Sequence, residues 1–67
     1  MTSVRLNGEP RELPGAGVVA DAVALLTAAT TGIAVAVDGV VVPRSLWASV
    51  VLLDGARVEV LTAVQGG

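Results

Sequence analysis

Polar and apolar residues alternate at the start of the chain and predict a β-strand over residues 3–6, because successive strand side chains point to opposite faces. Asn7-Gly8 follows, a pair that favours a two-residue hairpin turn because both residues tolerate positive φ. Residues 9–13 then form the returning strand. Pro10 has no N–H to donate, so this strand is predicted at an edge of the sheet.

Residues 18–29 show the apolar spacing of an amphipathic helix. Asp21 lies in the first turn, where a negative charge favours the helix dipole. No Ser, Thr, Asn or Asp precedes Val18, so the N-cap is weak and Gly17 is the best candidate for it. The face of the helix that packs on the sheet is predicted to contain Val19, Ala22, Val23, Leu25 and Leu26.

A second strand pair is predicted after the helix. The continuous apolar run over residues 33–37 is typical of a central strand that is covered on at least one side. Asp38-Gly39 is another hairpin turn and leads into a strand over residues 40–42. Pro43 ends that strand.

The last third of the chain predicts a short helical turn and a final strand. Residues 44–48 form the turn and bury Trp47, the only aromatic residue, at the end of the core. Asp54-Gly55 is interpreted as a third hairpin turn. Alternation over residues 57–62 points Val58 and Val60 inward and Arg57, Glu59 and Leu61 outward. The order of elements indicates an α+β fold, a mixed sheet of four or five strands packed on one main helix.

At 67 residues the chain has room for one domain, assigned to residues 1–63, with residues 64–67 as a flexible C-terminal tail. Its hydrophobic fraction of 54% is too high for a disordered chain. It contains neither cysteine nor histidine, so no thiolate or imidazole is available for catalysis. The carboxylates are scattered, without the spacing of a metal site or a catalytic pair. We therefore expect a protein that is not an enzyme and binds no cofactor or metal itself.

Charge and hydropathy argue against two classes of partner. Four arginines, no lysine and six acidic residues give a net charge of −2, whereas nucleic acid favours a clustered basic face. The longest charge-free stretch, residues 22–37, is interrupted by three threonines and a glycine and is too short to cross a membrane. The N-terminus has no apolar targeting segment. The expected location is cytoplasmic, without contacts to nucleic acid or membrane.

The chain stops at Val64-Gln65-Gly66-Gly67, and this diglycine end is its most informative feature. Two residues without side chains can be threaded down a narrow channel, because glycine has no Cβ and tolerates both signs of φ. The terminal carboxylate can then be presented to the active site of another protein. A chance pair of glycines in a poorly ordered terminus is the alternative interpretation.

Several segments, taken in chain order, carry a resemblance to a known family. They are NGEPREL at residues 7–13, VAVDG at 35–39, VPRSLWA at 42–48, DGARVEV at 54–60 and TAVQGG at 62–67. Together they closely resemble ThiS, the small sulfur carrier of thiamine biosynthesis. The resemblance spans nearly the whole chain and places the diglycine at the terminus.

The resemblance implies a ubiquitin-like β-grasp fold, with the first and last strands side by side in the middle of the sheet. It also implies that an E1-like adenylyltransferase (ThiF-type) uses ATP and magnesium to adenylate the carboxyl group of Gly67. Sulfur from a cysteine desulfurase or another source then displaces AMP and leaves a thiocarboxylate, which a thiazole synthase (ThiG-type) consumes. Gly66, Gln65 and Val64 are expected to form the recognised tail.

Two residues outside the tail are candidates for docking to these partners. Leu61 is expected to point outward from the last strand, where an apolar side chain is available to a partner. Arg44 follows a proline and is a candidate contact for the activating enzyme. A single exposed leucine and a solvated loop arginine are the alternative interpretations.

Other functions share a diglycine end. A molybdopterin-type sulfur carrier is usually longer, and the short length, Pro43-Arg44-Ser45 and Trp47 favour the thiamine pathway. A ubiquitin-like modifier uses the same activation but joins Gly67 to lysines on target proteins, and the sequence leaves this alternative open. A β-grasp interaction module with an inert tail is the remaining possibility.

Overall fold

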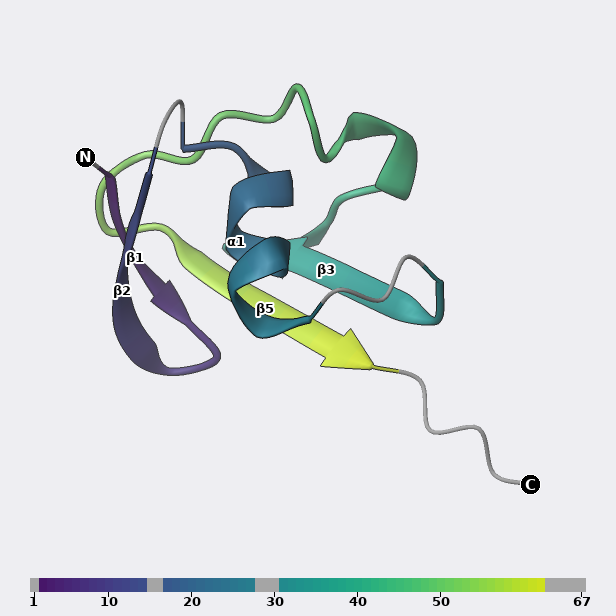
Figure 1. Cartoon of the computed structure of the whole chain (residues 1–67), viewed down its shortest axis with the longest axis horizontal. Coiled ribbons are helices and arrows are strands. Elements are labelled where there is room, and N and C mark those ends of the chain that lie inside the picture. The colour runs from purple at the N-terminus through teal and green to yellow at the C-terminus, as the bar shows by residue number, and fades with distance from the viewer. Residues whose placement is uncertain (1, 15–16, 28–30, 63–67) are drawn as a thin grey trace.

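The computed structural model describes residues 2–14, 17–27 and 31–62. The elements are β1 (Thr2–Leu6), β2 (Glu9–Leu13), α1 (Val19–Leu26), β3 (Ile33–Val37), β4 (Val40–Val41), the 3-10 helix η1 (Arg44–Leu46) and β5 (Arg57–Thr62). The five strands form one sheet in the order β2-β1-β5-β3-β4, and α1 lies across one of its faces (Figure 1). This arrangement confirms the predicted α+β fold and the ubiquitin-like β-grasp.

The first hairpin has the predicted geometry. Asn7 and Gly8 both have positive φ, at 51° and 84°, which matches the right-handed twist of the strands that they join. Strand β2 lies at the edge of the sheet, and Pro10 is opposite Arg5. The N–H of Arg5 points the other way and donates to the carbonyl of Ala56 at 2.8 Å. Proline therefore fits this position, because the pair requires no hydrogen bond from it.

Strand β5 occupies the middle of the sheet. It pairs in parallel with β1 through Arg5–Arg57 and Leu6–Val58, and antiparallel with β3 from Val58 to Thr62. β5 is the last strand of the described chain and is central in the sheet. Its C-terminal end lies at one edge of the molecule (Figure 1). The described residues therefore stop at the end of a central strand.

Helix α1 begins one residue later than predicted, and its N-cap is Val18 rather than Gly17. Valine has no side-chain acceptor, so Asp21 accepts the N–H of Val18 at 3.1 Å instead. Gly17 is required for a different reason. Its φ is +69°, and a Cβ atom there would lie 2.6 Å from Oγ1 of Thr2.

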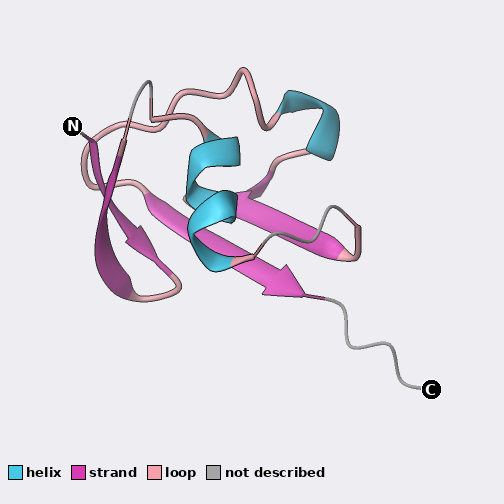
Figure 2. Cartoon of the chain, in the orientation of Figure 1, coloured by secondary structure: helices cyan, strands magenta, loops and turns pink. Residues whose placement is uncertain are grey.

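The loop between η1 and β5 completes the start of the helix (Figure 2). The N–H groups of Val19 and Ala20 donate to the carbonyls of Val50 and Trp47, at 3.0 and 2.9 Å. These are the groups that a helix leaves without an internal partner in its first turn. Backbone carbonyls that are distant in sequence thus replace the missing side-chain cap.

The C-terminal end of α1 also differs from the prediction, which extended the helix to Ala29. The last helical residue is Leu26, and Thr27 is extended at φ −157° and ψ 149°. Threonine is β-branched and favours extended backbone, so the helix ends there although alanines follow. Ala29 itself lies outside the described residues.

The buried face of α1 is narrower than predicted. Val19, Ala22 and Val23 are buried, whereas Leu25 and Leu26 are 39% and 40% exposed. The prediction was wrong for these two leucines because the helix ends at Leu26. Its last turn therefore leaves both leucines partly exposed to solvent.

The second hairpin and the short helical turn agree with the sequence prediction, although β4 is one residue shorter. Asp38 and Gly39 have φ of 49° and 84°. Trp47 follows η1 and is 8% exposed, and its Nε1–H donates to the carbonyl of Val42 at 3.0 Å. The single aromatic residue is thus buried with its polar atom satisfied.

Asp54-Gly55 is a turn, but it is not a hairpin turn of the predicted kind. Only Gly55 has positive φ, at 87°, and the N–H of Ala56 donates to the carbonyl of Leu53 at 3.0 Å. A two-residue hairpin of the Asn7-Gly8 kind needs positive φ at both central residues. This turn instead delivers the loop into β5.

The core lies between α1 and the sheet face that it covers. Its buried members are Val4, Leu6, Leu13, Val19, Ala22, Val23, Val35, Val42, Trp47, Leu52, Ala56, Val58 and Val60. No polar or charged residue is buried within the described part of the chain. Stability therefore comes from aliphatic packing around one tryptophan.

Candidate functional site

The reacting end of the predicted site lies outside the described residues. This end consists of Val64, Gln65, Gly66 and Gly67. The roles assigned to these residues therefore stay predictions. The structure does describe the strand that leads into them. The candidate site described below is therefore the surface at the end of β5.

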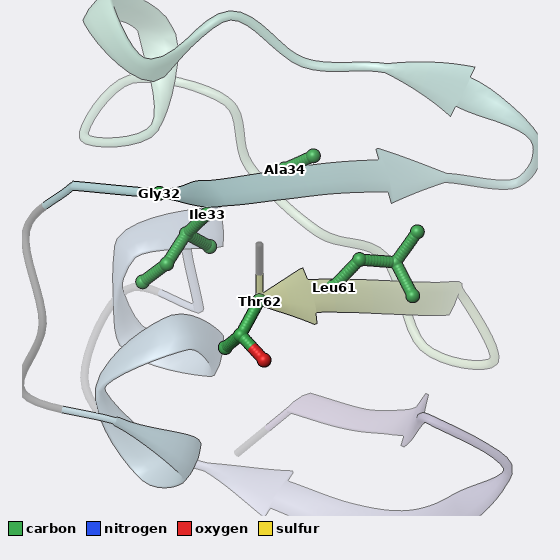
Figure 3. A pocket seen from close by; sticks show the side chains of 5 residues that line it. All are labelled: Gly32, Ile33, Ala34, Leu61 and Thr62. Carbon is green, nitrogen blue, oxygen red and sulfur yellow. The ribbon is translucent and has the colours of Figure 1, made fainter. Parts of the chain in front are cut away.

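A shallow hollow lies where β5 ends beside the start of β3. Leu61 is opposite Ala34, and Thr62 is opposite Ile33. With Gly32 these residues line a hollow of about 310 Å³ (Figure 3). The side chains of Ala34 and Leu61 lie on one side of the strand pair, and that of Ile33 extends toward α1 (Figure 3). This end of the sheet is open to a partner.

Leu61 points outward, as predicted, and is 67% exposed. It belongs to an apolar strip on the sheet face opposite α1, which we call the open-face strip and define as Ala34, Ala36, Val41 and Leu61. The strip lines a second, smaller hollow of about 130 Å³ together with Glu59 and Val35. An apolar surface of this kind on a solvated sheet face is typical of an interaction site.

Sequence reasoning missed three members of the open-face strip. Ala34 and Ala36 alternate with buried Val35 on β3, and Val41 on β4 pairs with Ala36. The sequence does indicate an apolar surface here, because residues 33–37 are apolar on both faces of the strand. A strand with only one buried face would carry polar residues at positions 34 and 36.

Arg44 lies in η1 and is exposed. Its carbonyl accepts the N–H of Trp47 at 3.1 Å, so its backbone supports the tryptophan. The lining of the two hollows at β5 does not include Arg44. The structure therefore does not bring it together with Leu61.

The carboxylates of the described residues either accept backbone hydrogen bonds or are exposed. The aspartates accept backbone hydrogen bonds at turns and at the helix start: Asp21 from Val18, Asp38 from Arg57 and Asp54 from Ser3. Among the described residues, no group of three or more His, Cys, Asp or Glu could hold a metal ion. Nor does this part of the chain contain a helix that is long and apolar enough to cross a membrane.

The arrangement is a small β-grasp domain with an apolar strip beside the strand that leads to a diglycine end. The ThiS family model matches residues 4–67, which includes that end. The chain belongs to the ThiS family. Membership places it among the sulfur carriers of thiamine biosynthesis, as the resemblance implied.

A solved structure agrees with the family assignment. The crystal structure of the thiamine biosynthesis protein ThiS from Geobacter metallireducens is similar to this ThiS-family chain with a TM-score of 0.74 at 28% sequence identity. The alignment covers 98% of this chain and 100% of that chain. No curated protein matches the chain by sequence.

Proposed function

We propose that this ThiS-family chain carries sulfur as a thiocarboxylate on the C-terminal carboxyl group of Gly67. The observation that carries the proposal is the family match through residue 67, which includes Gly66-Gly67. A carboxylate does not react with a sulfur nucleophile until one of its oxygens becomes a good leaving group. Adenylation provides that leaving group.

The proposed cycle uses partners for every chemical step. An E1-like adenylyltransferase (ThiF-type) joins the carboxylate to AMP, using ATP with magnesium and releasing pyrophosphate. Hydrosulfide, or a persulfide from a cysteine desulfurase, attacks the acyl carbon, and AMP leaves. After attack by a persulfide, a thiol reductant cleaves the resulting acyl disulfide and releases the thiocarboxylate. The thiocarboxylate then passes its sulfur to a thiazole synthase (ThiG-type). The absence of cysteine from this chain supports terminal attachment, because no side-chain thiol is available to hold a persulfide.

The open-face strip is the proposed docking surface for these enzymes, with Leu61 nearest to the tail. Leu61 is two-thirds exposed at the end of β5, one residue before the last described position. A partner that covers this face would exclude water from the strip as it receives Val64, Gln65 and Gly66. Arg44 is assigned a secondary contact at most, because it does not line the same hollows.

Deletion of Gly67 tests the proposed reacting group. The shortened chain should keep its fold, since every core residue lies before position 61, and should lose ATP–pyrophosphate exchange with the activating enzyme. Unchanged exchange would contradict the proposal. A strain that lacks the gene should require thiamine for growth, and growth without thiamine would remove the pathway assignment.

A further inference from the structure

The side chain of Asn7 continues the pairing of β5 beyond the end of β1. Asn7 donates its backbone N–H to the carbonyl of Val58 at 2.9 Å. Its side-chain Oδ1 then accepts the N–H of Val60 at 2.8 Å, and its Nδ2 donates to the carbonyl of Val60 at 3.1 Å. The side-chain amide thus satisfies both backbone groups of Val60, which a longer β1 would otherwise have paired.

Alternation along β5 explains why these bonds are needed. Val58 and Val60 direct their backbone groups toward β1, whereas Glu59 and Leu61 direct theirs toward β3. The ladder between β1 and β5 ends at Leu6–Val58. Val60 therefore lies past the last residue of β1, and within the described chain Asn7 makes the last hydrogen bonds on this edge of β5.

Asp38, in the second hairpin turn, holds the other end of β5. Comparison with it explains why position 7 is an asparagine. Asp38 donates its backbone N–H to the carbonyl of Arg57 at 2.8 Å and accepts the N–H of Arg57 through Oδ1 at 2.9 Å. Only an acceptor is required from its side chain, and a carboxylate supplies one. At Val60 both a donor and an acceptor are required, and the neutral amide of asparagine supplies both.

We propose that Asn7 is a positioning residue for activation of the C-terminal carboxyl group. Its amide ties Val60 into the sheet, so that the activating enzyme does not have to fix the end of β5 when it binds the chain. The inference rests on the proposed function. Without the amide, the end of β5 is held by β3 alone, and the enzyme must also bear the entropy cost of fixing residues 60–62.

The expected effect falls on binding and not on the chemical step. Fixing the backbone of one additional residue changes an equilibrium constant by about tenfold. Partial fraying of the end of β5 should therefore raise the KM of the activating enzyme for this chain by about 3- to 10-fold. The value of kcat should change less than about twofold, because Asn7 does not touch the reacting atoms.

Asn7→Gly and Asp38→Gly form a matched pair for the test. Glycine keeps positive φ at either turn, so both variants retain a favourable hairpin. Asn7→Gly loses two side-chain hydrogen bonds to β5, and Asp38→Gly loses one. Backbone amide exchange, followed by NMR, should accelerate at Val60 in Asn7→Gly and at Arg57 in Asp38→Gly. ATP–pyrophosphate exchange should show the raised KM in Asn7→Gly alone.

Two further variants separate hydrogen bonding from turn stability. Asn7→Asp removes the Nδ2 donor and sets a carboxylate against the carbonyl of Val60, so it should raise KM as well. Asp38→Asn keeps an acceptor for Arg57 and should behave as the unchanged chain. An equal KM for the Asn7→Gly and Asp38→Gly variants would overturn the role of Asn7 alone. Absence of pyrophosphate exchange in the unchanged chain would instead overturn the proposed function.

Discussion

At the scale of the residue, the inventory of donors and acceptors explains Asn7 and the aspartates. Asn7 supplies a donor and an acceptor to β5, Asp38 supplies an acceptor, and Asp21 accepts the N–H of Val18 at the start of α1. The sequence predicted the turns that contain Asn7 and Asp38, because their backbone preferences are local. It did not predict their bonds to β5, since those partners are 53 and 19 positions away.

Asp21→Ala should lower the free energy of unfolding by about 1 kcal/mol, because the N–H of Val18 loses its acceptor and the first helical turn loses a favourable charge. Denaturant unfolding followed by circular dichroism measures this change. Glu12→Ala is the control, since Glu12 is exposed on edge strand β2, and it should shift stability by less than about 0.5 kcal/mol. Equal losses in the two variants would show that Asp21 does not act as a cap.

At the scale of the element, local signals located the strands and turns well. The Asn-Gly and Asp-Gly pairs fixed both hairpins, and Pro10 fixed the edge strand. The ends of α1 were predicted less well. Its N-terminus is completed by carbonyls of Trp47 and Val50, which lie close to it only in the folded chain. Asp54-Gly55 was misassigned for a similar reason, because the conformation of its first residue is set by the surrounding loop.

Val18→Thr is the prediction that belongs to this scale. A new N-cap hydroxyl usually stabilises a helix by about 1 kcal/mol. Here the first N–H groups of α1 already donate to Val50 and Trp47, so the gain should be less than about 0.5 kcal/mol. Thermal and denaturant unfolding measure it. A gain of the usual size would mean that the loop carbonyls cap the helix poorly.

At the scale of the whole molecule, the last strand is central in the sheet, and its end borders the open-face strip. The family resemblance predicted the central position of β5, strand alternation predicted the outward direction of Leu61, and the structure confirmed both. The rest of the strip was not predicted, because Val41 joins it only through pairing between β3 and β4. A surface made from three strands becomes visible only when their register is known.

Leu61→Thr tests the open-face strip. Threonine keeps the preference for a strand and removes an apolar contact, so stability should change little while the KM of the activating enzyme rises about tenfold. Leu53→Thr is the matched control, because Leu53 is 75% exposed but lies in the loop before β5. Its KM should stay within about twofold of the original value. A similar rise in both variants would argue against a specific docking strip.

The mass of the intact chain recovered from cells that contain its activating enzyme tests the central claim most directly. We predict a fraction heavier by the exchange of one oxygen for sulfur, located at Gly67 by fragmentation and absent after deletion of that residue. A chain found only with its original mass, or only in higher-mass conjugates with other proteins, would contradict the sulfur-carrier account.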